Sequence, residues 1–389
     1  MKTHCTITFV LIFALSVVSA VNADEVPKPK SDLGRNAALV YWVAFDQYDS
    51  AIKDESLAKA VNDYTKAEVD AKLRATLKES TALSLLRLAS RIERCDWGTA
   101  DMLHEQGPMT LLPHLSRCRQ LTRLGLLRAR VHLIDKKPAQ ALEDLMAVHR
   151  LARHSQAGDI LITMLVGVAT EAMANQFVAD HLSVIDDATL RSYLDQRAKL
   201  PAMMHVRQAI IGERDGFGGW IKREFIKLQD APAMARLMAA LAGDEQGLLL
   251  RQIAGKSTEQ SIAMADDMIR MYDPLIKAMD LPPDQFSKAS EEWSEQIEAS
   301  KNPLVKLLMP AFATSYYTYH RSLARSAILH AAIIYRLDGK AAFEKIKDPY
   351  GDGSFTVANH EEGIVISSKL PDHDKTPVKL NVKWKPQEK

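Results

Sequence analysis

Between residues 35 and 346, apolar residues recur at helical spacing almost without pause. In the segment STALSLLRLASRIE one helix face has the apolar residues Leu83, Leu86, Ala89 and Ile92. Arg87 and Arg91 lie outside this apolar stripe. This spacing is typical of amphipathic helices that bury one face. Gly98, which can take a positive φ, is expected to end this helix. We therefore expect a mainly α fold, an irregular domain of helical hairpins over residues 35–346.

The segment LLRARVHLIDKKPAQALEDLMAVHRLARH (residues 126–154) predicts two helices joined by a short turn. Pro138 suits the first position of the second helix, where its missing N–H is no loss. The unit resembles a tetratricopeptide-like helical hairpin. A recurrence of about 34 residues, the period of such repeats, is absent on either side. We expect repeat-like packing inside an irregular helical body.

The sequence pattern changes after Ile346. The stretch DPYGDGSFTV (residues 348–357) is rich in turn-forming residues, and GIVISSKL and VKLNVKW have the β-branched residues of strands. Because a lone hairpin is marginal in water, we expect a small β hairpin or three-stranded patch, packed on the helices, over residues 347–389. The two prolines in DLPPDQF are a further break, at which the helical body can subdivide near residues 280–285.

Residues 1–23 have the anatomy of a secretory signal peptide: Lys2, an apolar block from about Ile7 to Val18, and small residues at the end. Cleavage is expected after Ala20 or Ala23, and residues 24–34 form a flexible lead-in. The alternative is an uncleaved membrane anchor. Such an anchor needs an apolar span of roughly 20 residues, and this apolar block is shorter than that. We expect export to the periplasm or the extracellular space, and no stable membrane span after cleavage.

The charges on the chain nearly cancel, with 50 lysines and arginines against 49 aspartates and glutamates. The whole chain therefore has no broad positive field to attract nucleic acid, which we do not expect as a partner. The sequence contains neither the zinc motif H-E-x-x-H nor the nucleophile motif G-x-S-x-G. We expect no cofactor, and a peptide or a protein as the partner.

Two cysteines follow the signal peptide, Cys95 and Cys118. In an oxidising compartment, one hypothesis is a disulfide between them, which would stabilise the fold by roughly 3 kcal/mol. The other hypothesis is that both are small buried residues with free thiols.

The run GERDGFGGW (residues 212–220) is rich in glycine and interrupts a helix expected over residues 201–227. Glu213 and Asp215 are a candidate acid and base there, and Asp96 is a third candidate catalytic residue. The structural alternative is a kink or loop whose charged side chains form ion pairs. Three further residues are candidates for binding a ligand: Trp97, Arg214 and Trp220.

The turn DPYGDG also invites comparison with a calcium loop. Asp348 and Asp352 fit positions one and five of that pattern. Tyr350 stands at position three, and Asn359 occupies position twelve, where a bidentate glutamate is needed. We therefore expect a turn and no metal site, with Asp348 and Asp352 as the weak candidate ligands.

Several of these segments, taken in order, resemble a family. RCDWG (residues 94–98), the end of the hairpin, GER (residues 212–214) and the D-P-[FY]-x-G turn are similar to those of uncharacterised exported, mostly helical proteins of planctomycete-type bacteria. The closing turn is also similar to that of type II secretion pseudopilins, but a pilin-type N-terminal helix is absent. The family resemblance implies export and a helical fold, without an activity.

Two functions remain open from the sequence. The first is an exported, non-enzymatic binding or scaffold protein that holds a peptide or protein on a concave helical surface. The alternative is a hydrolase of an envelope or extracellular substrate, which would use Glu213 and Asp215 in the glycine-rich helix break.

Overall fold

The computed structural model describes residues 36–228, 253, 256–309, 312–371 and 376–386. The expected signal peptide, its two cleavage positions and the lead-in lie outside the described residues.

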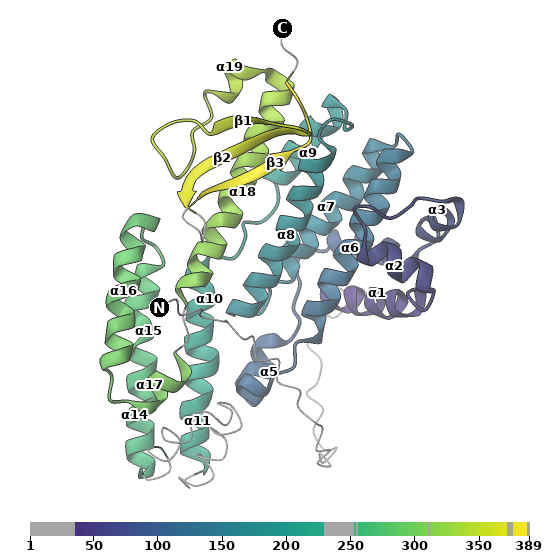
Figure 1. The fold of residues 1–389 in the computed structure, drawn as a ribbon. Helices are drawn as coiled ribbons and strands as arrows, with labels where there is room; N and C mark the ends of the chain where they lie inside the picture. The colour runs from purple at the N-terminus through teal and green to yellow at the C-terminus, as the bar shows by residue number, and fades with distance from the viewer. Residues whose placement is uncertain (1–35, 229–252, 254–255, 310–311, 372–375, 387–389) are drawn as a thin grey trace, which may run out of the picture. The chain divides into compact units, whose positions relative to one another are not determined.

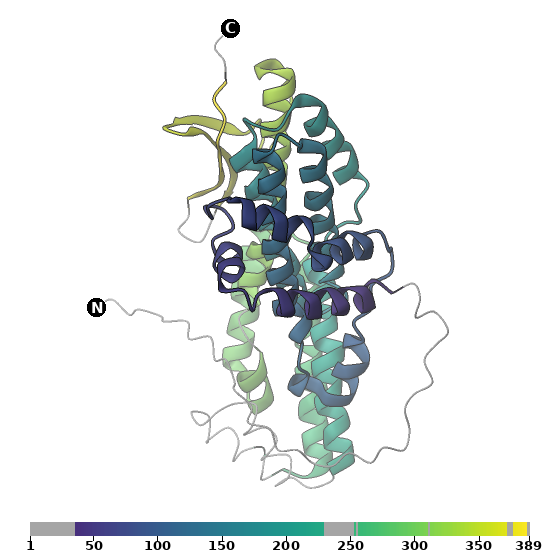
Figure 2. The ribbon, with the colours of Figure 1, turned by 90° about the vertical axis from the view of Figure 1, so that its right-hand side faces the viewer.

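The first helices form a layer against the hairpin. α1 (Ala37–Ala51) packs against α4 (Thr81–Ser90), while α2 (Glu55–Asn62) and α3 (Ala71–Lys78) contact the next long helix. Each of the four begins at a capping side chain that accepts a backbone N–H: Asn36, Asp54, Asp70 and Ser80. Figure 2 shows these purple helices lying across the blue and teal ones.

The predicted hairpin consists of α6 (Pro113–Ile134) and α7 (Pro138–His154). Pro138 stands at the first position of α7, and Lys136 in the connection has a positive φ of 57°. α7 is surrounded by other helices: it contacts α6, α4, α8 (Leu161–His181) and α9 (Asp187–Ala198) (Figure 1). The helix that follows the short connection is therefore held on several sides.

Among the described helices, α8 is the one long and apolar enough to cross a membrane. However, 61 % of its most apolar stretch is buried in the protein. It packs against α7 and against α18 (Ala313–Asp338). A core helix of a folded domain has the same composition.

Two clusters of buried apolar side chains make up the core, and α8 and α18 contribute to both. The first cluster contains Phe177 of α8 and Ile328 of α18, together with buried side chains of α1, α4, α6, α7 and the sheet. The second takes Met164 of α8 and Tyr316 of α18, together with the helices from residue 206 to residue 309. These two helices therefore connect one core to the other.

The helices around the second core include α10 (Val206–Glu213) and α11 (Gly219–Leu228), with a π-helical turn, η3 (Arg214–Gly218), between them. The glycine-rich run thus widens the helix by a turn without ending it. α5 (Thr99–Gln106) and the short η2 (Gly107–Met109) pack against this turn. The remaining helices of this core are α14 (Thr258–Arg270), α15 (Tyr272–Ala278), α16 (Pro283–Ala299) and α17 (Pro303–Leu308).

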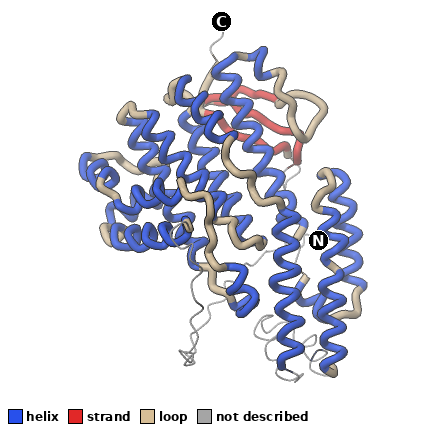
Figure 3. The backbone as a smooth tube through the Cα atoms, turned by 180° about the vertical axis from the view of Figure 1, so that it is seen from behind, coloured by secondary structure: helices blue, strands red, loops and turns tan. Residues whose placement is uncertain are grey.

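The chain ends in a three-stranded antiparallel sheet in the order β1 (Thr356–His360), β2 (Gly363–Pro371) and β3 (Pro377–Val382). β2 is central, and Ile366 pairs with Val357 on one side and Leu380 on the other. The sheet contacts α18, and β3 also contacts α8 (Figure 3). The short helix α19 (Lys340–Phe343) precedes it.

The predicted fold class, mainly α with a small C-terminal β patch, is confirmed. The expectation for Gly98 was wrong in part. Gly98 has a positive φ of 71°, but it stands at the start of α5, whereas α4 ends at Ser90. The loop between them is held by hydrogen bonds to Asn36 at the start of α1.

Candidate functional site

An open groove lies between α4, α7 and α9, with a cavity volume of about 420 Å³. Its floor is one face of α7, at the i, i+3, i+4 and i+7 spacing that aligns side chains on a helix. The floor residues are Glu143, Met146, Ala147 and Arg150. The two sides are formed by Arg87, Ser90 and Arg91 near the end of α4, and by Gln196, Lys199 and Leu200 at the end of α9.

The groove has more positive than negative charge. Arg87 pairs with the carboxylate of Glu143 at 2.6 Å, which neutralises the one acidic residue of the lining. For Arg91, Arg150 and Lys199, the described part of the chain provides no salt-bridge partner. We define the basic groove by these three cations and the apolar side chains of Met146 and Leu200.

A buried carboxylate holds α7, α8 and α9 together behind the basic groove. Glu171 of α8 is 1 % exposed. It accepts hydrogen bonds from Arg153 of α7 at 2.7 Å and Arg197 of α9 at 2.9 Å. Arg197 also donates to the hydroxyl of Ser326 in α18. Because buried charges are costly unless paired, this network fixes the spacing of the helices that form the groove.

His149 of α7 completes this network. Its Nδ1 lies 2.8 Å from Glu171 and its Nε2 lies 3.1 Å from the hydroxyl of Tyr193. Burial lowers the pKa of His149 despite the attraction of Glu171. A neutral ring with its proton on Nδ1 then donates to the carboxylate and accepts from the tyrosine.

The pKa of Glu171 follows from its partners. Burial acts to raise it, but the hydrogen bond from His149 and the charges of Arg153 and Arg197 together lower the pKa well below the usual range. Burial likewise raises the pKa of Tyr193 to about 12. At neutral pH the network therefore contains an ionised glutamate, a neutral histidine and a protonated tyrosine.

A second buried carboxylate fixes the other end of α7. Asp144 is fully buried and accepts hydrogen bonds from Arg128 of α6 at 2.5 and 2.9 Å and from Arg87 of α4 at 2.7 Å. The arginine at this end of the groove is therefore held by both Asp144 and Glu143. The two networks make the groove a preformed surface.

The candidate acid and base of the glycine-rich run have separate partners. Glu213 accepts a hydrogen bond from the backbone N–H of Leu161 at 2.9 Å, which caps the start of α8. Burial raises the pKa of Glu213, against the effect of that hydrogen bond. Asp215 pairs with Arg214 at 2.7 Å and its side chain is 60 % exposed; Arg214 also reaches Asp273 at 3.3 Å.

The glycines of this region are explained by close packing. A Cβ at Gly212 would stand 1.6 Å from the carbonyl oxygen of Asp159, whose own φ is 53°. Gly107 packs in the same way on the ring of Trp220, where a Cβ would come within 2.2 Å of the indole. Trp220 is buried, and the structure places it against this backbone and not in an open pocket.

The RCDWG segment is also built into the fold. Asp96 accepts a hydrogen bond from the N–H of Gly98, and its backbone pairs with Asn36 at the start of α1. Trp97 is buried, stacks on His114 at 4.6 Å between ring centroids and donates to the carbonyl oxygen of His154. Asp96 and Glu213 are each bonded near a different helix start, Asp96 at α1 and Glu213 at α8.

Cys95 and Cys118 carry free thiols in the structure, and both lie at the first core. Burial raises the pKa of each thiol. The disulfide between them remains a prediction.

The carboxylate of Asp348 is occupied by protein donors. It accepts from the backbone N–H of Tyr350 and Lys369 and from the hydroxyl of Ser368, at 3.1, 2.5 and 2.8 Å. Asp348 thereby fastens the turn to β2. Among the described residues, no group of three or more His, Cys, Asp or Glu side chains is arranged to hold a metal.

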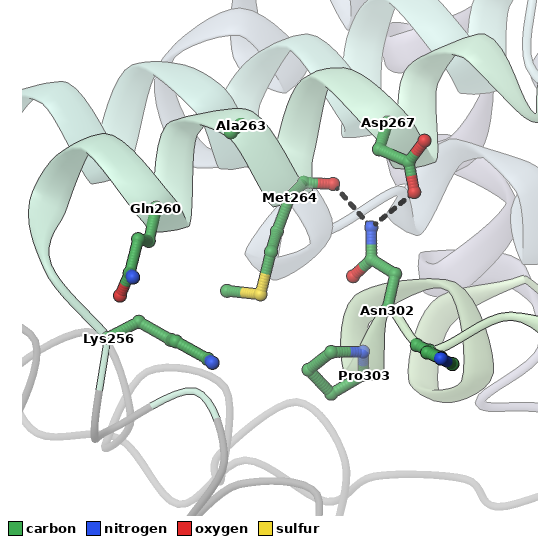
Figure 4. A pocket seen from close by; sticks show the side chains of 8 residues that line it. Lys256, Gln260, Ala263, Met264, Asp267, Asn302 and Pro303 are labelled. Carbon is green, nitrogen blue, oxygen red and sulfur yellow. Dashed lines mark hydrogen bonds between the residues drawn. The ribbon is translucent and has the colours of Figure 1, made fainter.

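A second cavity, of about 490 Å³, lies between α14 and the start of α17. Figure 4 shows Asn302 donating to the carbonyl oxygen of Met264 and to Asp267, at 2.8 and 3.0 Å. Lys256 on its rim adjoins residues 254–255, which lie outside the described part of the chain. The basic groove on α7 is the better defined of the two.

Sequence reasoning missed the residues that define this site. Arg91 was recognised only as a residue off the apolar stripe, and Arg150 and Lys199 stand in unremarkable helical segments. One available signal was Glu171, a single carboxylate within the apolar run of α8. A charge in such a run needs partners, and those partners lie on the helices around the groove. Comparisons with family models, with curated proteins and with solved structures found no match.

Proposed function

We propose that this chain is an exported, non-enzymatic binding protein that holds an acidic segment of a partner protein in the basic groove. The observation that carries the proposal is the set of three cations, Arg91, Arg150 and Lys199, without carboxylate partners among the described residues. Opposite charges on a bound segment would complete these pairs and speed its capture.

The chemistry of the groove favours a polypeptide. Met146 and Leu200 stand among the cations, so the lining suits a chain that has both apolar and acidic side chains. Nucleic acid suits it less, because the chain has a net charge of only +1 and no broad positive field. A protein partner also agrees with the repeat-like hairpin expected from the sequence, since such hairpins present extended binding surfaces.

The fixed walls of the groove support tight recognition. Asp144 and Glu171 hold α7 against α4, α6, α8 and α9 through buried ion pairs. A preformed surface binds with a smaller cost of ordering its own side chains. The partners found for Glu213 and Asp215 favour a structural role for that pair, so we do not extend the hydrolase hypothesis.

Fluorescence polarisation with a fluorescein-labelled hexaglutamate peptide tests the proposal on the full-length chain at low salt. Arg150→Glu is expected to weaken binding by about tenfold or more, equivalent to about 1.4 kcal/mol. Lys78→Glu is the matched control, because Lys78 is an exposed cation of α3 outside the groove. Binding should fall as salt rises.

Two results would contradict this function. One is no binding of the acidic peptide at low salt by a chain whose circular dichroism shows it folded. The other is an equal loss of affinity in Arg150→Glu and Lys78→Glu, which would show that only the overall charge matters.

A further inference from the structure

We infer that the basic groove recognises an apolar residue spaced two positions from an acidic one, and that it admits this pair in one orientation along α7. This inference rests on the proposed function and adds the sequence pattern of the partner. It follows from the order of side chains along the floor of the groove.

The floor has three zones. Glu143 stands at one end, where it pairs with Arg87, and Met146 and Ala147 form an apolar centre. Arg150 stands at the other end of the floor. Arg91, just after α4, and Lys199, just after α9, line the same groove. One end of the groove therefore has an exposed carboxylate that is paired with an arginine, and the other end has cations without carboxylate partners among the described residues.

The spacing of these zones fits an extended peptide. Met146 and Arg150 are four residues apart on α7, a rise of about 6 Å. Side chains two positions apart on an extended chain point to the same face and are separated by about 6.6 Å. An aliphatic side chain over Met146 therefore places the side chain two positions along at Arg150. The matching pattern is apolar-x-acidic, read from the centre of the groove toward its positive end.

Glu143 sets the orientation. Its side chain is 56 % exposed, so its carboxylate faces any segment that enters that end. An acidic residue bound there would meet a like charge, while Arg87 is already held by two carboxylates. Repulsion of this kind is a common source of specificity. Removing the charge of Glu143 should let acidic residues bind at both ends.

Two labelled peptides test the pattern in the polarisation assay. Both have a glycine-serine background and the segment Leu-Ser-Glu-Glu, and in the second a serine replaces the leucine. The full-length chain is expected to bind the leucine peptide about tenfold more tightly, because the leucine loses contact with water. Met146→Ser should remove this difference, and Glu143→Gln should raise the affinity of a peptide with acidic residues on both sides of the leucine.

The outcomes separate the inference from the function it rests on. If both peptides bind wild type with equal affinity, the pattern is wrong, but binding of acidic segments in the basic groove stands. If Met146→Ser weakens both peptides equally, the leucine is not placed over Met146 and the pattern is again wrong. If neither peptide binds while hexaglutamate also fails, both the pattern and the proposed function are wrong.

Discussion

Two partly or fully buried glutamates in this protein have opposite environments. Glu171 is surrounded by Arg153, Arg197 and His149, and its pKa is lowered. Glu213 has one backbone N–H as its partner, and burial raises its pKa. Glu171 is an ionised residue that joins three helices through ion pairs and hydrogen bonds. Glu213 is a helix cap, and its environment in the folded chain favours the neutral form of its carboxyl group.

The difference shows which sequence signal is informative. Glu213 drew attention because glycines surround it, yet those glycines are needed where Gly212 meets the backbone of Asp159. Glu171 drew none, because its neighbours in sequence are apolar and its cationic partners stand 18 and 26 positions away. A lone charge in an apolar run indicates distant partners more reliably than a charged residue beside glycines indicates catalysis.

The largest expected effect is that of Glu171→Gln. The change leaves Arg153 and Arg197 buried near an uncharged amide, and breaking a buried ion pair in this way costs about 3 to 5 kcal/mol. The free energy of unfolding, measured by urea denaturation at pH 7, checks it. Glu213→Gln is the matched control and should lose less than about 1 kcal/mol, because the amide oxygen can still accept from Leu161. Equal losses in the two variants would remove the distinction drawn between the two glutamates.

Gly212→Ala should have the next largest effect. The new methyl group would overlap the carbonyl oxygen of Asp159, and overpacking of this kind costs about 1 to 3 kcal/mol or more. Gly216→Ala is the control in the same region, since its Cβ would meet only Leu103 at 3.9 Å. Alanine there should leave stability unchanged or raise it by up to about 1 kcal/mol, since alanine is the better helix former. If Gly212→Ala unfolds at the same urea concentration as wild type, the packing explanation of this glycine fails.

The sequence predicted the regular part of this fold well. The hairpin of residues 126–154 has a strong helical period and a proline at the right position, and α7 begins at Pro138 as expected. The strands of residues 363–371 and 377–382 also fall on the predicted β segments. These features depend on neighbours in sequence, which a single chain displays.

The candidate site could not be found in the same way. Arg91, Arg150 and Lys199 come from three helices, and their approach depends on how α4, α7 and α9 pack. Asp96 and Trp97 were chosen from a short motif, whose hydrogen bonds to Asn36 and His154 only the fold reveals. Tertiary contacts of this kind leave no local pattern.

The pH dependence of stability separates the two glutamates further. The pKa of Glu213 is raised on folding, so its stabilising contribution is complete below the ordinary value of 4.5 and is lost as pH rises through the folded value. The pKa of Glu171 is lowered, so its contribution is present above 4.5 and is lost as pH falls. The stability of Glu213→Gln relative to wild type should therefore rise as pH increases from about 4 to 7, whatever small loss the substitution causes by itself. Urea denaturation of both chains across this range would show it, and a variant that loses stability relative to wild type as pH rises toward 7 would contradict the effect of burial on Glu213.

Asp215→Asn should have the smallest effect. The side chain of Asp215 is mostly exposed and its ion pair with Arg214 is a surface one, which contributes at most about 0.5 to 1 kcal/mol. Arg214 also keeps Asp273 after the change, so little of its charge is left without a partner. The expected shift in the free energy of unfolding is within about 0.5 kcal/mol, with Asp273→Asn as the matched control. A loss as large as that of Gly212→Ala would mean that Asp215 has a role in the fold beyond this pair. Asp215 would then resemble Glu171, whose ion pairs organise the surrounding helices, more than it resembles Glu213.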